Sequence, residues 1–181
     1  MKIFHSLGRW TMTSGSTFLL AVLAVVITCT AVSAAARRPA NVWNYYHFVG
    51  QGFVAGQPAD NSPFLAVQNR VQPVVLTRSA KIEAVALPPD KGALAGICYI
   101  QSSGGKLGAG HGYTPCSRTP VTISSGNNVE TSVLSDENGY YIALLTAGRY
   151  RIGSGLFAVE VTVENGTTVL APLRAGKRMV D

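Results

Sequence analysis

Residues 136–150 read DENGYYIALLTAGRY and decide the fold class. The segment begins with a turn, because Gly139 supplies backbone freedom directly after three polar residues. A strand follows from Tyr140, with successive side chains on opposite faces, and both faces are apolar as far as Leu145. A second turn ends at Gly148. The segment therefore predicts a strand that lies centrally in its sheet, between two tight turns.

The clearest two-residue period in the chain lies between residues 157 and 164. Apolar side chains alternate there with charged and polar ones, as in a strand with one buried and one solvated face. Asn165 and Gly166 come next, between two extended runs, and such a pair is the strongest short signal for a type I′ hairpin turn. We therefore expect the strand that returns through residues 169–173 to pair with the strand before the turn.

Further short runs with alternating residues predict additional strands. They are residues 82–87 (IEAVAL), 96–101 (GICYIQ), 119–124 (TPVTIS) and 129–135 (VETSVLS). In all there are about seven or eight short strands separated by turn residues, with no convincing helix after residue 36. The sequence predicts an all-β fold, an antiparallel β-sandwich of about seven strands.

Residues 1–36 have the pattern of a secretory signal peptide. Two basic residues precede the apolar run 18–28, and small residues follow it. The run is shorter than the roughly 20 apolar residues that span a bilayer, so we expect cleavage near Ala34 or Ala36 rather than a permanent anchor. The protein is thus predicted to be secreted (extracellular, cell surface or periplasm) and to meet a membrane only through this segment before cleavage.

Cleavage would leave about 145 residues, enough for one domain with its own core. The formal net charge of +6 would fall to about +4, because two cations lie in the leader. The remaining Lys and Arg residues do not cluster with aromatic residues, so nucleic-acid binding is not expected.

Two cysteines remain after the leader, Cys98 and Cys116. Export leads to an oxidising compartment, where an even pair is most simply a disulfide. The pair has no Cys-x-x-Cys spacing and no histidine pair nearby, so it does not predict a zinc site. No metal and no other cofactor is expected.

The quoted segment also fills a spaced pattern of one aspartate, two glycines, two tyrosines and a leucine. The members are Asp136, Gly139, Tyr141, Leu145, Gly148 and Tyr150. This pattern resembles the carboxypeptidase regulatory-like domain, a transthyretin-like relative of the collagen-adhesin B-type repeats. The resemblance covers about residues 81–177, and it implies an Ig-like or transthyretin-like sandwich in which the six residues build turns and core, without catalysis. The chain departs from the family pattern in residues 102–116, a longer link between the first two strands.

Residues 37–80 fall outside the resemblance. They are aromatic-rich and then glycine-rich, without a helical period, and we expect an irregular N-terminal arm or edge segment. Residues 63–77 offer one or two short extended runs, and Pro73 restricts them to an edge strand or a connection. The expected organisation is a signal peptide (1–36), this arm (37–80) and a sandwich (81–177).

Two groups of side chains are candidates for binding. They are Trp43, Tyr45, Tyr46 and Phe48 in the arm, and His111 and Tyr113 in the 102–116 link. The arm aromatics either form a platform that stacks on sugar rings or packs into a partner, or they cover an open face or edge of the sandwich. The arm also suits strand addition to a neighbouring copy, which would give self-association.

We expect a non-catalytic module that binds another exported protein, a filament or a surface polysaccharide, or that serves as a structural subunit of an extracellular assembly. The alternative is a small secreted hydrolase or an accessory subunit of a secreted enzyme. A triad for that alternative would use His111, a serine and Asp136, but no G-x-S-x-G elbow supports it.

Overall fold

The computed structural model describes residues 42–104, 112–126 and 128–180, which belong to one compact unit. The signal peptide predicted for residues 1–36 lies outside the described residues, and so does His111. Within the described part, no helix is both long and apolar enough to cross a membrane.

The described residues form thirteen strands and one short 3₁₀-helix, η1 (Gly155–Phe157). The strands are β1 (Asn44–Phe48), β2 (Phe53–Ala55), β3 (Phe64–Val67), β4 (Val74–Leu76), β5 (Lys91–Gly104), β6 (Gly112–Pro115), β7 (Pro120–Ser125), β8 (Asn128–Leu134), β9 (Tyr140–Thr146), β10 (Gly148–Ile152), β11 (Val159–Val163), β12 (Thr168–Leu170) and β13 (Leu173–Val180). The chain is therefore all-β in this part, as the alternating sequence pattern predicts.

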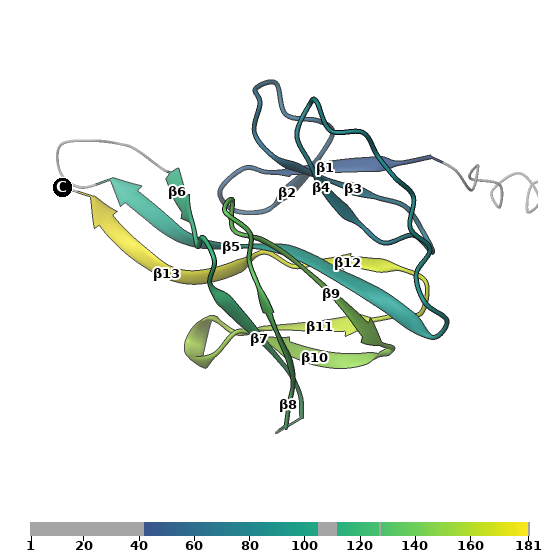
Figure 1. Cartoon of the computed structure of the whole chain (residues 1–181). Coiled ribbons are helices and arrows are strands. Elements are labelled where there is room, and N and C mark those ends of the chain that lie inside the picture. The colour runs from purple at the N-terminus through teal and green to yellow at the C-terminus, as the bar shows by residue number, and fades with distance from the viewer. Residues whose placement is uncertain (1–41, 105–111, 127, 181) are drawn as a thin grey trace, which may run out of the picture. The chain divides into compact units, whose positions relative to one another are not determined.

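The strands form three sheets (Figure 1). The first has the order β2-β1-β3-β4, and another has the order β11-β10-β7-β8. Between them lies the sheet built on β5, which pairs in parallel with β12 and β13 along one edge and antiparallel with β9 and β6 along the other. A seven-strand antiparallel sandwich was predicted, and the structure adds a third sheet and two parallel strand pairs.

The middle sheet is buried on both faces. Ala95 and Ile97 of β5 pack with Phe48 and Leu65 of the first sheet. On the opposite face, the alternate residues of β5 pack with the sheet of β7 and β10. The side chains of that second core include Leu94, Cys98, Val121, Ile123, Tyr150 and Ile152. Because alternate residues of a strand point to opposite faces, β5 contributes to two cores at once.

The apolar character of both faces of β9 has the same origin. Tyr141, Ala143 and Leu145 belong to the core shared with β7 and β10, whereas Tyr140 belongs to the core shared with β1 and β3. In its own sheet, β9 pairs with β5 alone among the described strands, so the predicted central position in the sheet is wrong. The strand is apolar on both faces because it lies in the middle layer.

The predicted hairpin at Asn165 and Gly166 is also wrong. The residues do form a turn, in which Thr167 N–H donates to the Glu164 carbonyl over 3.3 Å. Gly166 has a φ of 71°, but Asn165 is not in the positive-φ region that a type I′ turn requires at both positions. The strands on either side pair elsewhere, β11 with β10 and β12 with β5. The turn therefore carries the chain from one sheet to another.

Two further predictions need correction. The arm is not irregular, because residues 44–76 form the whole four-stranded first sheet, in which β1 has neighbours on both edges. β4 follows Pro73 and is an outer strand, in agreement with the predicted effect of that proline.

Residues 82–87 are not a strand and make only one isolated bridge, between Val71 and Ala86. Backbone hydrogen bonds from Gln72 to Val85 and from Leu87 to Arg70 accompany this bridge, so the alternating pattern of 82–87 does not extend into a strand pair.

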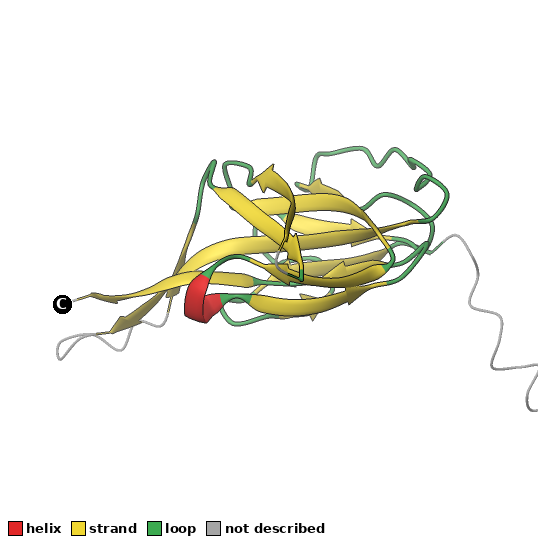
Figure 2. Ribbon diagram, turned by 90° about the horizontal axis from the view of Figure 1, so that it is seen from below, coloured by secondary structure: helices red, strands yellow, loops and turns green. Residues whose placement is uncertain are grey.

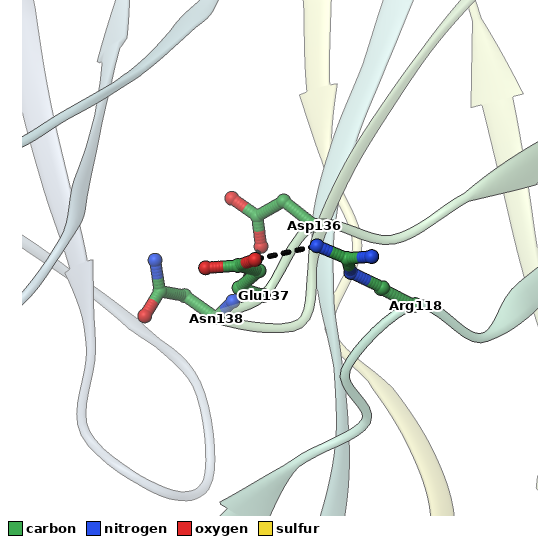
Figure 3. Close-up of polar contacts among 4 residues, drawn as sticks. All are labelled: Arg118, Asp136, Glu137 and Asn138. Atoms are coloured by element: carbon green, nitrogen blue, oxygen red, sulfur yellow. Dashed lines mark hydrogen bonds and ion pairs between the residues drawn. The ribbon is translucent and has the colours of Figure 1, made fainter.

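The turn before β9 is built by the carboxylate of Asp136. Its Oδ1 atom accepts the backbone N–H groups of Asn138 and Tyr140, each over 2.8 Å. Gly139 follows with a φ of 80°, and a Cβ atom on it would lie 2.6 Å from the carbonyl oxygen of Cys98. Figure 3 shows the loop, with Glu137 turned outward to form an exposed ion pair of 2.6 Å with Arg118.

The other residues of the family-like pattern lie in turns and core. Tyr141, Leu145 and Tyr150 are buried, and Gly148 begins β10 directly after the second turn. The Tyr141 hydroxyl donates to the Ala171 carbonyl over 2.5 Å, and the Tyr150 hydroxyl donates to the Thr146 carbonyl over 2.9 Å. These residues thus serve architecture in this structure.

Candidate binding site

The structure divides the four arm aromatics between the two faces of the first sheet. Trp43 and Tyr45 are half-buried and pack with Phe64 on the face turned away from β5. The rings of Tyr45 and Phe64 meet edge to face, with centroids 5.8 Å apart. Tyr46 and Phe48 pack on the opposite face, within the core shared with β5. The four side chains therefore do not form one open platform.

Phe48 is the centre of an aromatic cluster. Its side chain is only 6% exposed, and its ring centroid lies 5.7 Å from that of Phe53, 4.6 Å from that of Tyr99 and 4.8 Å from that of Tyr113. The contact with Tyr113 joins the arm to β6. Two segments that the sequence singled out separately for binding are thus brought together by packing.

A cavity of about 430 Å³ opens beside this cluster. It lies where the turn after β1 and residues 60–62 meet the end of β5 and the start of β6. Phe48 and Tyr113 supply its aromatic wall. The polar side chains that line it are Gln51, Asp60, Ser62, Gln101 and Ser102. Its size is in the range of small-ligand pockets, which span roughly 300–1,000 Å³.

The turn after β1 is shaped to cover Tyr113. Gly50 has a φ of 90°, and a Cβ atom there would lie 3.4 Å from Cδ1 of Tyr113. The turn is closed by the Val49 N–H, which donates to the Gly52 carbonyl over 3.1 Å. A glycine at position 50 permits both the left-handed backbone and the close approach to the ring.

The polar groups of the cavity include both donors and acceptors. The Asp60 carboxylate accepts the Ser62 backbone N–H over 3.0 Å and keeps further lone pairs for a ligand. Nη1 of Arg174 donates a hydrogen bond to the Oε1 atom of Gln101 over 3.1 Å. The amide nitrogen of Gln101 therefore remains available as a donor to a ligand. Gln51 is exposed at the rim. Carboxylates and carboxamides around an aromatic ring suit a ligand with many hydroxyls and one apolar face.

Asp60 and Tyr113 are the two titratable side chains among the described residues that line this cavity. Hydrogen bonds from the Ser62 hydroxyl and backbone lower the pKa of Asp60, so this carboxylate is ionised at neutral pH. Burial, followed by the negative charge of Asp60, raises the pKa of Tyr113, so its hydroxyl stays protonated and can donate. The cavity therefore combines one ionised acceptor with one neutral phenol donor.

The carboxyl groups that glycoside hydrolysis would need can be compared with the described lining of the cavity. Glycoside hydrolysis ordinarily needs two carboxyl groups on either side of the scissile bond. Asp60 is the only carboxylate among the described residues that line the cavity, and its lowered pKa is opposite to that of a general acid. The Asp136 carboxylate considered for a triad instead caps the turn before β9. Among the described residues, no three His, Cys, Asp or Glu side chains gather as metal ligands.

Cys98 and Cys116 are both buried and are free thiols in the structure. Burial, together with a hydrogen bond to Cys116, raises the pKa of the Cys98 thiol to about 12. The two residues lie at the base of β6, which carries Tyr113. The disulfide between them stays a prediction, and the fold places the two thiols side by side for it.

Sequence reasoning missed the polar residues of the cavity. Gln51 and Asp60 both lie in the arm, whereas Gln101 lies far from them in the chain, and none of the three belongs to a recognisable motif. Asp60-Asn61-Ser62 reads as ordinary turn chemistry. Only the pairing of β5 with β6 and the packing of Phe48 against Tyr113 bring these side chains to one place.

Comparison with known proteins gives little further information. No family model matches the chain, and no curated protein sequence matches it. Among solved structures, it is similar to GBS52, the minor pilin of the gram-positive pathogen Streptococcus agalactiae. The match has 14% sequence identity and a TM-score of 0.36, and it covers 72% of this chain and 66% of that one, just under two thirds of the pilin chain. A similarity at this level supports no inference about function.

Proposed function

We propose that this protein is an exported, non-catalytic β-sandwich module that binds a surface or extracellular polysaccharide. The observation that carries the proposal is the cavity where Phe48 of the first sheet meets Tyr113 of β6. An aromatic wall can pack against the apolar face of a sugar ring, while Asp60, Gln51 and Gln101 exchange hydrogen bonds with its hydroxyls.

The composition of the cavity favours a saccharide over a protein partner. Buried protein interfaces are depleted in charged side chains at their centres and need about 800 Å² on each partner. The cavity is instead a concave pocket with five polar side chains around two rings. The arm also gives no free strand for a neighbour through β1, because β2 and β3 occupy both of its edges. Self-association by donation of β1 is therefore disfavoured.

We also infer that residues 81–177 correspond to a carboxypeptidase regulatory-like sandwich, with residues 44–76 as an added sheet on one face. The roles of Asp136 and Gly139 in the turn, and of Tyr141 and Tyr150 in the core, support this inference. Export by a cleaved leader ending near residue 36 belongs to the same proposal, since an extracellular polysaccharide is met only outside the cell.

The test is binding to an array of immobilised neutral and acidic glycans, followed by calorimetric titration of the soluble oligosaccharide that binds best. Asp60→Asn keeps an oxygen that can accept the Ser62 N–H, and Gln51→Ala removes an exposed amide, so both variants should fold. We expect each to weaken binding by about tenfold, because each removes a hydrogen bond to the ligand.

The matched control is Gln57→Ala, which removes an exposed amide outside the cavity and should leave the affinity unchanged. Binding that survives both Asp60→Asn and Gln51→Ala would place the glycan elsewhere on the protein. Release of reducing sugar from any bound glycan would favour the alternative, a secreted hydrolase. Absence of binding to every glycan would overturn the proposal.

A further inference from the structure

The short helix η1 presents an apolar tip to solvent. Leu156 is 99% exposed and Phe157 is 38% exposed, which is unusual for two adjacent large apolar side chains. η1 connects β10 to β11 and contacts β13 (Figure 2, red). The tip therefore protrudes from the sheet of β10 at one end, well separated in the chain from the residues of the proposed glycan cavity.

Two arginines hold the base of this tip. Nη2 of Arg151 donates to the Gly155 carbonyl over 3.1 Å, and the guanidinium of Arg174 lies 4.9 Å from the centre of the Phe157 ring. Gly155, the first residue of η1, has a φ of 63°, in the left-handed region that glycine adopts readily. The tip is therefore positioned by contacts from β10 and β13.

The surroundings of the tip are positively charged. Arg149 is exposed on the same face of β10 as Arg151, two residues earlier. Glu160 stands opposite Arg151 in the strand register, yet the described residues include no ion pair for Arg149, Arg151 or Arg174. Arg151 and Arg174 thus contact the loop that carries the two exposed apolar side chains. Arg149 lies farther from this loop along β10, and Glu160 is the carboxylate opposite Arg151.

We propose that this tip docks on the interface of an anionic lipid bilayer. Leu and Phe on an apolar side with Arg on the flanks is the composition of interfacial membrane-binding segments. Leu156 and Phe157 would enter the boundary between headgroups and acyl chains, and the arginines would contact lipid phosphates.

A protein partner fits the same surface less well. A stable protein interface needs about 800 Å² on each side with complementary packing, whereas two convex side chains cover only a small part of that area. Leucine is also under-represented among the side chains that dominate protein–protein affinity. A bilayer needs no shape complementarity, and it supplies negative charge for the arginines. The sequence alone predicts no membrane contact beyond the leader, so this surface was visible only in the folded structure.

The experiment places an environment-sensitive fluorophore at the tip of the full chain. Ser154→Cys suits the label, because Ser154 is exposed and its side chain makes no capping hydrogen bond. Cys98 and Cys116 are buried, and Cys29→Ser removes the thiol of the leader segment. The same label at Ser132→Cys, exposed on β8, is the position control. The probes are vesicles of phosphatidylcholine alone and of an equimolar mixture with phosphatidylglycerol.

We expect a blue shift at Ser154→Cys with the phosphatidylglycerol vesicles only, and none at Ser132→Cys. Leu156→Ser should abolish the shift, whereas Leu134→Ser, which changes another exposed leucine on β8, should preserve it. Arg149→Gln should raise the lipid concentration needed for half of the shift several-fold, whereas Lys81→Gln should not. Because the label reports its own surroundings, attachment through the leader cannot mimic insertion of the tip.

An unchanged spectrum at Ser154→Cys with both vesicles would overturn the proposal, and so would equal shifts at both label positions. A Leu156-dependent complex with a soluble acidic protein, with no response to vesicles, would assign the tip to a protein partner and overturn the lipid assignment. None of these results depends on glycan binding, so the two proposals can fail separately.

Discussion

Cys98 and Cys116 stand directly opposite each other, and the backbone N–H of Cys116 donates to the carbonyl oxygen of Cys98 over 2.8 Å. Their alignment continues the antiparallel register that pairs Tyr99 with Pro115. Residues opposite each other in such a register have Cα atoms about 4.5–5.5 Å apart, inside the range of about 4.4–6.8 Å found for disulfides. The fold therefore brings the two thiols within bonding reach without rearrangement of the backbone.

The exported protein is expected to carry this disulfide. Each thiol loses a proton and the pair gives two electrons to a disulfide oxidant of the compartment, which is reduced to two thiols. The bond closes a loop of about 17 residues, so its reduction should lower the free energy of unfolding by about 3 kcal/mol. Urea unfolding with and without reductant measures this difference, and the mass after alkylation under denaturing, non-reducing conditions reports the bond.

The double variant Cys98→Ala with Cys116→Ala is the control, because reductant should no longer affect its stability. Alkylation of both cysteines in denatured protein taken directly from the exported pool would show that the bond is absent. The prediction of a structural disulfide would then be wrong, and the buried pair would be explained by packing alone.

The reduced protein should also lose stability at high pH. Burial raises the pKa of the Cys98 thiol from its ordinary 9.0 to about 12 in the folded protein. The unfolded chain therefore loses this proton at lower pH than the folded chain does, so the stabilising effect is complete below pH 9 and is lost as the pH rises toward 12. Buried tyrosines titrate in the same region, so the informative measurement is the difference between reduced protein and Cys98→Ala across that range. Parallel curves would contradict the assignment to Cys98.

The strands of the 81–177 region could be predicted because their side chains alternate. Residues 96–101, 119–124 and 129–135 all fall largely within observed strands, as does the strand predicted from Tyr140. What alternation cannot give is the partner of each strand. The turn at Asn165 and Gly166 shows this, because β12 pairs in parallel with β5, which lies more than 60 residues earlier, and not with β11.

The first sheet and the cavity were less accessible to prediction for a related reason. β2 and β4 have three residues each, too few to display a two-residue period. Aromatic residues in this region favoured burial over binding, but the sequence does not show which face of the sandwich they would cover. Phe48 is buried because β5 presents Tyr99 to it, a contact between positions about 50 residues apart.

Gly139→Ala should destabilise the protein more than an ordinary turn substitution. Gly139 has a φ of 80°, and the added Cβ would lie 2.6 Å from the carbonyl oxygen of Cys98 and 2.9 Å from Cβ of Pro115. The left-handed backbone costs about 1 kcal/mol for alanine, and the overpacking adds about 1–3 kcal/mol. Gly126→Ala is the matched control, since its φ is 58° but nothing lies within 4 Å of the added atom. Equal losses in urea unfolding for the two variants would show that backbone conformation alone matters at Gly139.

Tyr141→Phe should cost about 1–3 kcal/mol of unfolding free energy, because it leaves the buried carbonyl of Ala171 without its partner. The hydroxyl of Tyr141 donates to that carbonyl over 2.5 Å, and a Cβ on Gly96 would lie 2.1 Å from the same oxygen. β5, β9 and the connection between β12 and β13 are therefore closely packed there. Tyr99→Phe is the control: Tyr99 is also buried, but its hydroxyl makes no hydrogen bond to a described residue. Thermal and urea unfolding of the pair should separate loss of a hydroxyl from loss of a hydrogen bond. If both variants were as stable as the parent protein, the hydrogen bond to Ala171 would not contribute to holding the middle sheet together.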